Sequence, residues 1–111
     1  MPRPSKRNDI ALLDDIRAAS ALIVSFARGK LLPDFVADPL LRSGICLQLL
    51  IIGETATHVT EATKRKFKRI AWKEMSSLRN RVVQVYWDLN PLIVWDVIRN
   101  DIPQLLEELG P

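Results

Sequence analysis

Apolar residues recur at alternating steps of three and four along most of the chain, the spacing of one face of an α-helix. Four such stripes are present, and residues that commonly begin or end helices lie between them. The stripes are Ile16-Ala19-Ile23-Phe26, Ile45-Leu49-Ile52-Ala56-Val59, Met75-Leu78-Val82-Val85 and Trp95-Ile98-Ile102-Leu105-Leu109. Four amphipathic helices with short connections predict an all-α fold, an antiparallel four-helix bundle.

Capping residues set the expected limits of the first helix. Asn8 or Asp9 should begin it, because both side chains can accept a hydrogen bond from the first turn. Gly29 is a plausible stop, since glycine favours the backbone conformation that ends helices. Residues 31–37 are then expected to form a connector that Pro33 keeps from being helical.

The second helix should open with Asp38 as its cap and Pro39 in its first turn. It should end within residues 64–68, where cations suit the C-terminal end of the helix dipole. This helix carries more apolar residues than one stripe needs. A central position in the bundle and a dimer interface explain this excess equally well; the additional residues are Leu47, Leu50 and Ile51.

The fourth helix should begin at Asn90 and Pro91, after the turn that follows the third. Pro103 lies inside its stripe, where a proline removes one backbone hydrogen bond and clashes with the preceding turn. We therefore expect this helix to be kinked near Pro103, with Asn100 or Asp101 as a local cap.

The chain has 111 residues, which fits one domain. We assign residues 1–7, which include two prolines, to a flexible tail and residues 8–111 to a single helical domain. Hydrophobic residues make up 48% and charged residues 26%, which excludes a disordered chain. No uninterrupted apolar run exceeds four residues, the length of residues 49–52, which is too short for a membrane span, and no targeting signal is visible. We expect a soluble cytoplasmic protein with no membrane partner.

Metal or cofactor chemistry has little support in the sequence. Cys46 is the only cysteine and His58 the only histidine, so no pair of them has the spacing of metal ligands. No glycine-rich phosphate loop is present either. We therefore predict no metal and no cofactor.

Positive charge is concentrated in one short region of a chain whose net charge is +3. Such a cluster either follows a nucleic-acid backbone electrostatically or is simply the solvated end of a helix. As candidate RNA-binding residues we take Lys64, Arg65, Lys66, Lys68, Arg69 and Lys73.

The third helix, expected over residues 72–86, is unusually polar in its second half. At about 100° per residue, Arg79 and Tyr86 align within roughly 20°, whereas Arg79 and Gln84 lie about 140° apart. The segment reads Arg79-Asn80-Arg81-Val82-Val83-Gln84-Val85-Tyr86.

This segment resembles the Arg-Asn-x-x-x-His-x-Tyr signature of the HepT-like toxins of the HEPN superfamily, with glutamine at the position of the histidine. Four flanking segments are similar to the family in order and spacing, and the resemblance covers about residues 8–109. They are Leu50-Ile51-Ile52-Gly53-Glu54-Thr55-Ala56, Ile70-Ala71-Trp72-Lys73-Glu74 and Ile93-Val94-Trp95-Asp96 with Asp101-Ile102-Pro103.

The resemblance implies a HEPN-like helical homodimer with a cleft at the dimer axis, acting as a metal-independent endoribonuclease. It also implies a cognate minimal nucleotidyltransferase antitoxin, which silences the toxin by attaching AMP to the motif tyrosine. Among the catalytic candidates, Arg79 would hold the phosphate, Asn80 would orient the phosphate or base, and Tyr86 would donate a hydrogen bond. Tyr86 would also be the AMP acceptor.

Gln84 departs from this scheme, because a carboxamide does not exchange protons at useful pH. Loss of a general acid–base group costs about 10²- to 10⁴-fold in rate, so we expect this chain to be catalytically impaired. Two explanations are that the glutamine is a natural change in a degenerate member or a deliberate inactivation of the protein. A third is that the chain tolerates Gln84 because other residues perform the catalysis. The alternative functions are a non-catalytic HEPN module that binds the nucleotidyltransferase or RNA, and a purely structural helical dimer.

Overall fold

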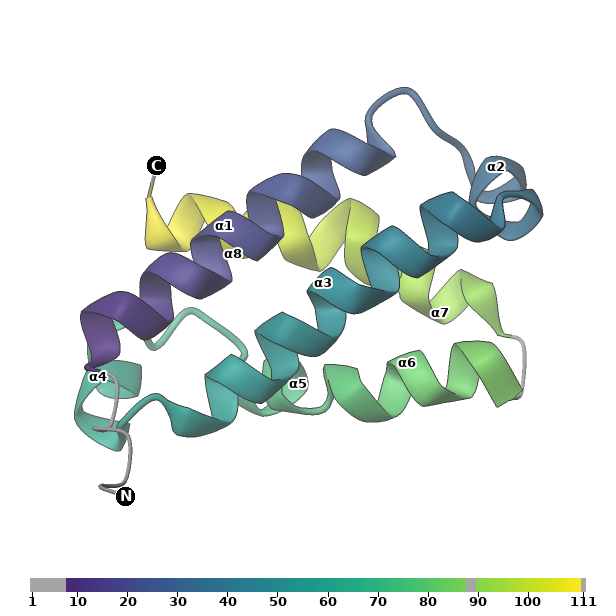
Figure 1. The fold of residues 1–111 in the computed structure, drawn as a ribbon. Helices are drawn as coiled ribbons and strands as arrows, with labels where there is room; N and C mark the ends of the chain where they lie inside the picture. The colour runs from purple at the N-terminus through teal and green to yellow at the C-terminus, as the bar shows by residue number, and fades with distance from the viewer. Residues whose placement is uncertain (1–7, 88–89, 111) are drawn as a thin grey trace, which may run out of the picture.

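The computed structural model describes residues 8–87 and 90–110, apart from the side chains of 83–87, and every regular element there is helical. Figure 1 shows four long helical arms that run in alternating directions along the chain. The arms are α1 (Asp9–Ala27), α3 (Pro39–His58), α6 (Leu78–Trp87) and a last arm made of α7 (Pro91–Asp96), η1 (Val97–Asp101) and α8 (Ile102–Leu109). The predicted all-α antiparallel bundle is confirmed. The expected tail, residues 1–7, lies outside the described residues.

Helix α1 begins as the sequence predicted, because the Asn8 side chain accepts a hydrogen bond from the N–H of Ala11 at 2.9 Å. The buried face of α1 differs from the prediction at its last turn. Phe26 is 38% exposed, whereas Ala27 is buried one turn after Ile23. The inward row therefore continues by a step of four to the small residue, and the phenylalanine lies on the surface.

Residues 31–37 are not the irregular connector that Pro33 suggested, since α2 (Leu32–Ala37) is a short helix. Pro33 lies in its first turn, where a missing N–H costs no hydrogen bond. The helix is fixed by Phe35, which is fully buried and meets the Trp95 ring at a centroid distance of 5.3 Å. A local cap, in which the Asp34 carboxylate accepts from the Leu31 N–H at 2.8 Å, and the packing of one aromatic residue thus together make a helix of a proline-containing segment.

Asp38 caps α3 as predicted and accepts hydrogen bonds from two N–H groups of its first turn. The prediction that this helix ends within residues 64–68 is wrong, because α3 ends at His58. A separate helix α4 (Glu61–Lys66) follows, capped by Thr60. The Asp9 carboxylate accepts hydrogen bonds from the hydroxyls of Thr60 and Thr63, which fixes this turn against the start of α1.

Helix α3 is the central element, since α1, α2, α5 and α6 all contact it. It is long and apolar enough to cross a membrane by length and composition alone, but its predicted stripe is buried among the other arms. Of the three apolar residues beyond that stripe, Leu50 is partly buried against the core, whereas Leu47 is 55% exposed and Ile51 is 36% exposed. The central position of α3 therefore accounts for Leu50 but not for Leu47 and Ile51.

The third predicted helix is two helices, α5 (Trp72–Ser76) and α6, separated at Ser77. The Ser77 hydroxyl donates to the Glu74 carbonyl at 2.8 Å, a local bond that ends α5. Met75, Leu78 and Val82 are buried as the stripe predicted, and Val85 lies outside the described side chains.

The last arm begins at Pro91 with Asn90 before it, as predicted, and is irregular near Pro103. Neither Asn100 nor Asp101 supplies the expected cap, because no side-chain capping bond forms at the start of α8. Instead the N–H of Ile102 bonds to the Val97 carbonyl five residues earlier. This π-helical turn lets the arm continue through the proline.

Candidate functional site

The first turn of α6 carries the start of the motif segment. Leu78 and Val82, one turn apart, are almost completely buried and hold this end of α6 against the core. Arg79 and Asn80 lie on the opposite side and are exposed. The two residues that were expected to contact phosphate therefore lie at the surface, on a helix end whose inner face is fixed.

Gln84 and Tyr86 belong to the same helix, but their side chains lie outside the described residues. The predicted alignment of Arg79 with Tyr86, and the separation of Arg79 from Gln84, stay predictions. What the backbone does provide is one continuous helix, α6, from Leu78 to Trp87.

Arg79 is paired with a residue of the central helix. Its Nη1 donates to Oε2 of Glu54 at 3.1 Å, and both side chains remain more than half exposed. Glu54 Oε1 also faces Nε2 of His58 at 3.9 Å. Exposed ion pairs of this kind contribute about 0–1 kcal/mol, so Glu54 orients the guanidinium without holding it firmly.

Gly53 lets the motif region approach α3 closely. A Cβ atom at this position would lie 3.1 Å from the Arg79 nitrogen, 3.3 Å from the Met75 oxygen and 3.4 Å from the Leu78 Cβ. The sequence marked Gly53-Glu54 only as a landmark of resemblance. The structure gives each residue a physical role: Gly53 makes room for the α5–α6 junction, and Glu54 meets Arg79 there.

The predicted basic cluster is divided between different surfaces. Four of its six residues line one pocket of about 420 Å³, together with Glu61, Trp72 and Ser76. These four are Lys64, Arg65, Lys68 and Lys73. Lys66 is exposed outside that pocket, and Arg69 lines a different one. The sequence therefore found the cations but not the way the fold groups them. We call this first pocket the basic pocket.

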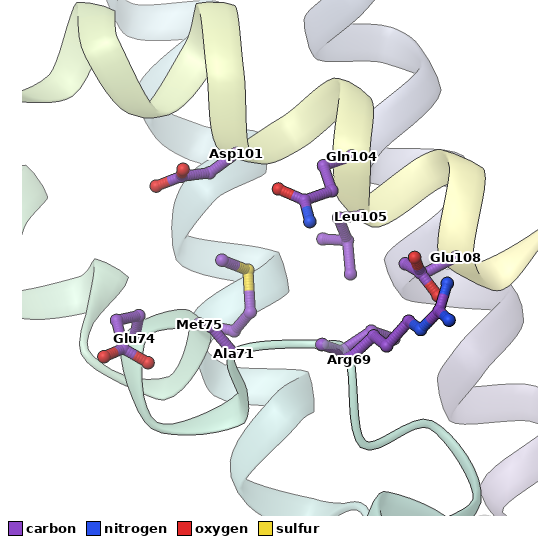
Figure 2. A pocket seen from close by; sticks show the side chains of 9 residues that line it. Arg69, Ala71, Glu74, Met75, Asp101, Gln104, Leu105 and Glu108 are labelled. Atoms are coloured by element: carbon purple, nitrogen blue, oxygen red, sulfur yellow. The ribbon is translucent and has the colours of Figure 1, made fainter.

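A second pocket of about 170 Å³ lies between the α5 region and the last arm. Figure 2 shows its polar side chains, of which three are carboxylates and one is the Arg69 guanidinium. The carboxylates belong to Glu74, Asp101 and Glu108. Burial, and then the neighbouring Asp96, raise the pKa of Asp101 above its ordinary range. We call it the acidic pocket, and sequence reasoning missed it because its members are far apart in the chain.

Outside these two pockets, the described residues provide neither a metal-binding cluster nor a reactive cysteine. Within residues 8–87 and 90–110, as far as they are described, no group of three or more His, Cys, Asp or Glu side chains could hold a metal ion. Cys46 is buried, and this burial raises the pKa of its thiol to about 11. The thiol is therefore protonated at neutral pH and behaves as part of the core.

Comparison with known proteins identifies the family. A family model described as ribonuclease HepT-like matches residues 16–110. A protein of Thermococcus cleftensis named "Probable ribonuclease HepT" is 31% identical over 100 residues, which cover 90% of this chain and 91% of the relative. A protein of Methanocaldococcus jannaschii named as a candidate RNase is 28% identical over 105 residues, 95% of this chain and 96% of the relative. No solved structure gives a significant match. The chain therefore belongs to the HepT-like ribonuclease family.

Proposed function

We propose that this chain is the toxin of a toxin–antitoxin system, a metal-independent endoribonuclease that cleaves RNA in a cleft between two copies. Family membership supports the ribonuclease class. The observation that carries the proposal is the exposed guanidinium of Arg79, which lies on the first turn of the motif helix and is oriented by an exposed ion pair with Glu54. Such a guanidinium is available to bind a phosphate through two parallel hydrogen bonds.

A row of residues on α3 supports a homodimer. Leu47 and Ile51 are exposed apolar residues one turn apart, and Glu54 and His58 continue the same row. Glu54 contacts Arg79, so the row runs beside the motif helix. A second copy covering this row would bury its apolar part and bring two Arg79 side chains toward one cleft.

The proposed reaction needs a group that takes the proton of the ribose 2′-hydroxyl while Arg79 stabilises charge on the phosphate. Gln84 occupies the family's histidine position and has no titrating proton near neutral pH. The chain should therefore bind RNA but cleave it only slowly.

Restoring the histidine tests this function. Gln84→His should raise RNA cleavage by about 10²- to 10⁴-fold, the usual contribution of a general acid–base group. Adding Arg79→Ala to that variant should abolish the gain. Cleavage of a labelled RNA in the presence of EDTA is the measurement, with circular dichroism to show that each variant is folded. A folded Gln84→His protein that cuts no RNA contradicts the proposal.

The antitoxin is proposed to be a minimal nucleotidyltransferase that attaches AMP to Tyr86. We expect the gene of such a nucleotidyltransferase to lie beside the gene of this chain. Its product, incubated with the chain and ATP, should add the mass of one or more AMP groups. Tyr86→Phe should remove that addition. No mass gain with an active nucleotidyltransferase contradicts this part.

A non-catalytic module that binds the nucleotidyltransferase or RNA is the second candidate, and Gln84 is the observation that favours it. It predicts AMP addition or RNA binding without any gain of cleavage in Gln84→His.

A further inference from the structure

The basic pocket contains cations that the fold leaves uncommitted. In the part of the chain that the structure describes, no ion pair or hydrogen bond engages the side chains of Arg65, Lys68 and Lys73. All three are exposed and line the same hollow. Like charges held close together repel each other, so this arrangement costs stability unless an anion binds there.

The fourth cation shows how a structural lysine differs. The Lys64 side chain is only 18% exposed, its Nζ lies 3.8 Å from Glu61, and it stands 5.9 Å from the centre of the Trp72 ring. Trp72 is itself fixed, because its indole N–H donates to the Phe67 carbonyl at 3.1 Å. Lys64 and Trp72 thus form a firm wall, beside which the other three cations remain available.

The basic pocket is close to the motif helix along the chain. Ser76, at the end of α5, lines the pocket, and Arg79 lies three residues later on the first turn of α6. Figure 1 shows α5 directly beside the start of α6, with α4 farther along at the end of the bundle where α1 begins and α3 ends. An anion chain that left the pocket along α5 would therefore meet Arg79 next.

We propose that the basic pocket binds the phosphate backbone of single-stranded RNA and leads the strand to Arg79. The proposal rests on the ribonuclease function, which it deepens by naming where the substrate is held outside the cleft. Flexible lysine and arginine side chains suit a strand of variable shape, and the apolar indole edge gives a ribose or base a surface to contact.

The neighbouring surface disfavours any other path on this side. Across α5, the acidic pocket presents three carboxylates and one guanidinium. Because the carboxylates outnumber the guanidinium, this surface would repel a polyanion. The strand is thus confined to the side of α5 that carries Lys73.

The test measures RNA binding by the full chain. Because Gln84 is expected to make cleavage slow, the RNA should stay intact during the measurement. Fluorescence anisotropy with labelled poly(U) is recorded over a range of salt concentrations. The triple variant Arg65→Gln, Lys68→Gln and Lys73→Gln should bind about tenfold or more weakly. Its salt dependence, the slope of log K against log salt, should fall by about 2, because each lost phosphate contact removes about 0.7.

A matched control separates this pocket from net charge. Arg28→Gln, Lys30→Gln and Arg99→Gln also remove three exposed positive charges, from the surface around the end of α1 and the last arm. This variant should keep most of the RNA affinity. Equal losses in the two triple variants, or an unchanged affinity in the first, would overturn the proposal.

A competition experiment distinguishes a polymer site from a simple phosphate site. Unlabelled poly(U) should displace the labelled RNA far better than UMP at the same total phosphate concentration. Equal displacement overturns the RNA assignment. The inference can fail independently of the ribonuclease function. If Gln84→His cleaves RNA but the pocket variants bind RNA normally, only the pocket inference is overturned. If the pocket variants lose RNA binding but Gln84→His stays inactive, only the ribonuclease function is contradicted.

Discussion

The basic and acidic pockets share one wall and have opposite charge. Helix α5 has only five residues, yet Trp72, Lys73 and Ser76 line the basic pocket while Glu74 and Met75 line the acidic one. Along the sequence, Lys73 and Glu74 are neighbours and would cancel. The helical turn sends them to different sides, so charge density along a sequence says little about the charge of a surface.

The difference extends to how the two pockets are built. The cations of the basic pocket all come from residues 64–73, so local sequence alone reveals them. The acidic pocket needs the last arm to fold back onto α5, since Asp101 and Glu108 come from there. The charged residues of a surface made from one segment can be found in the sequence, although their grouping cannot, whereas a surface made from two distant segments leaves no local sign at all.

The largest expected effect comes from loosening the shared wall. Met75 is the buried residue of α5, 4% exposed, and it lines the acidic pocket. Met75→Ala should lower the free energy of unfolding by about 2–4 kcal/mol, because a buried side chain is lost and a cavity remains. Urea denaturation measures this. Met75→Leu, which keeps the volume, should cost less than about 1.5 kcal/mol. Equal effects of the two substitutions would show that α5 is not anchored by this contact.

A smaller effect is expected where the wall rests on α3. Gly53→Ala places a methyl group 3.1 Å from the Arg79 backbone nitrogen, and overpacking outweighs the gain in helix propensity. We expect a loss of about 1–2 kcal/mol in the free energy of unfolding. Gly44→Ala is the matched control on the same helix, since its new Cβ would lie 3.6 Å from the Phe26 ring, an ordinary contact. It should stabilise the protein by about 0.5–1 kcal/mol. Stabilisation by both substitutions would contradict the close approach at Gly53.

The smallest effect sharpens the comparison through pH. Hydrogen bonds from Thr60, and then Thr63, lower the pKa of Asp9, whereas burial raises the pKa of Asp101. Ionised Asp9 therefore stabilises the fold above the ordinary aspartate pKa, and this is lost as pH falls through the lowered value. Ionisation of Asp101 lowers stability progressively as pH rises above the ordinary aspartate pKa, and this loss is complete above its raised value.

Two asparagine variants should respond in opposite ways. At neutral pH, Asp9→Asn should be less stable than the parent chain and Asp101→Asn more stable. Both differences should fade in acid, where the parent carboxyls are protonated. Denaturation midpoints over a pH series provide the measurement. Two shifts of the same sign at neutral pH would rule out this explanation.

The long helices could be predicted because their signals are local. The stripes of α1 and α3 follow the helical period, and Asn8 and Asp38 cap within their own first turns. The places where prediction failed depend on distant contacts. Phe35 makes a helix of residues 32–37 by packing on Trp95, and Asp9 fixes the turn between α3 and α4 through Thr60. The sequence around these residues does not predict either contact.

The candidate site shows the same division. The motif segment and its cations are visible in sequence, because type and spacing suffice to find them. The role of Gly53 is not, because a glycine within an apolar helix gives no sign that another backbone lies against it. The grouping of Lys73 with Lys64 and Arg65, rather than with Arg69, likewise depends on how α5 packs beside α4.

Because Arg79 is paired with Glu54, phosphate binding at Arg79 would exchange one anion for another. When a guanidinium with no partner in the protein neutralises an RNA phosphate, the cations condensed on that phosphate are released with a gain in entropy. Arg79 must first leave Glu54, and the freed carboxylate then attracts cations back from solution, which offsets part of that release. Under the proposed function, Arg79 should add less to the salt dependence of RNA binding than Arg65, Lys68 or Lys73. The site of chemistry would then select its ligand by geometry, and the basic pocket would capture it by charge.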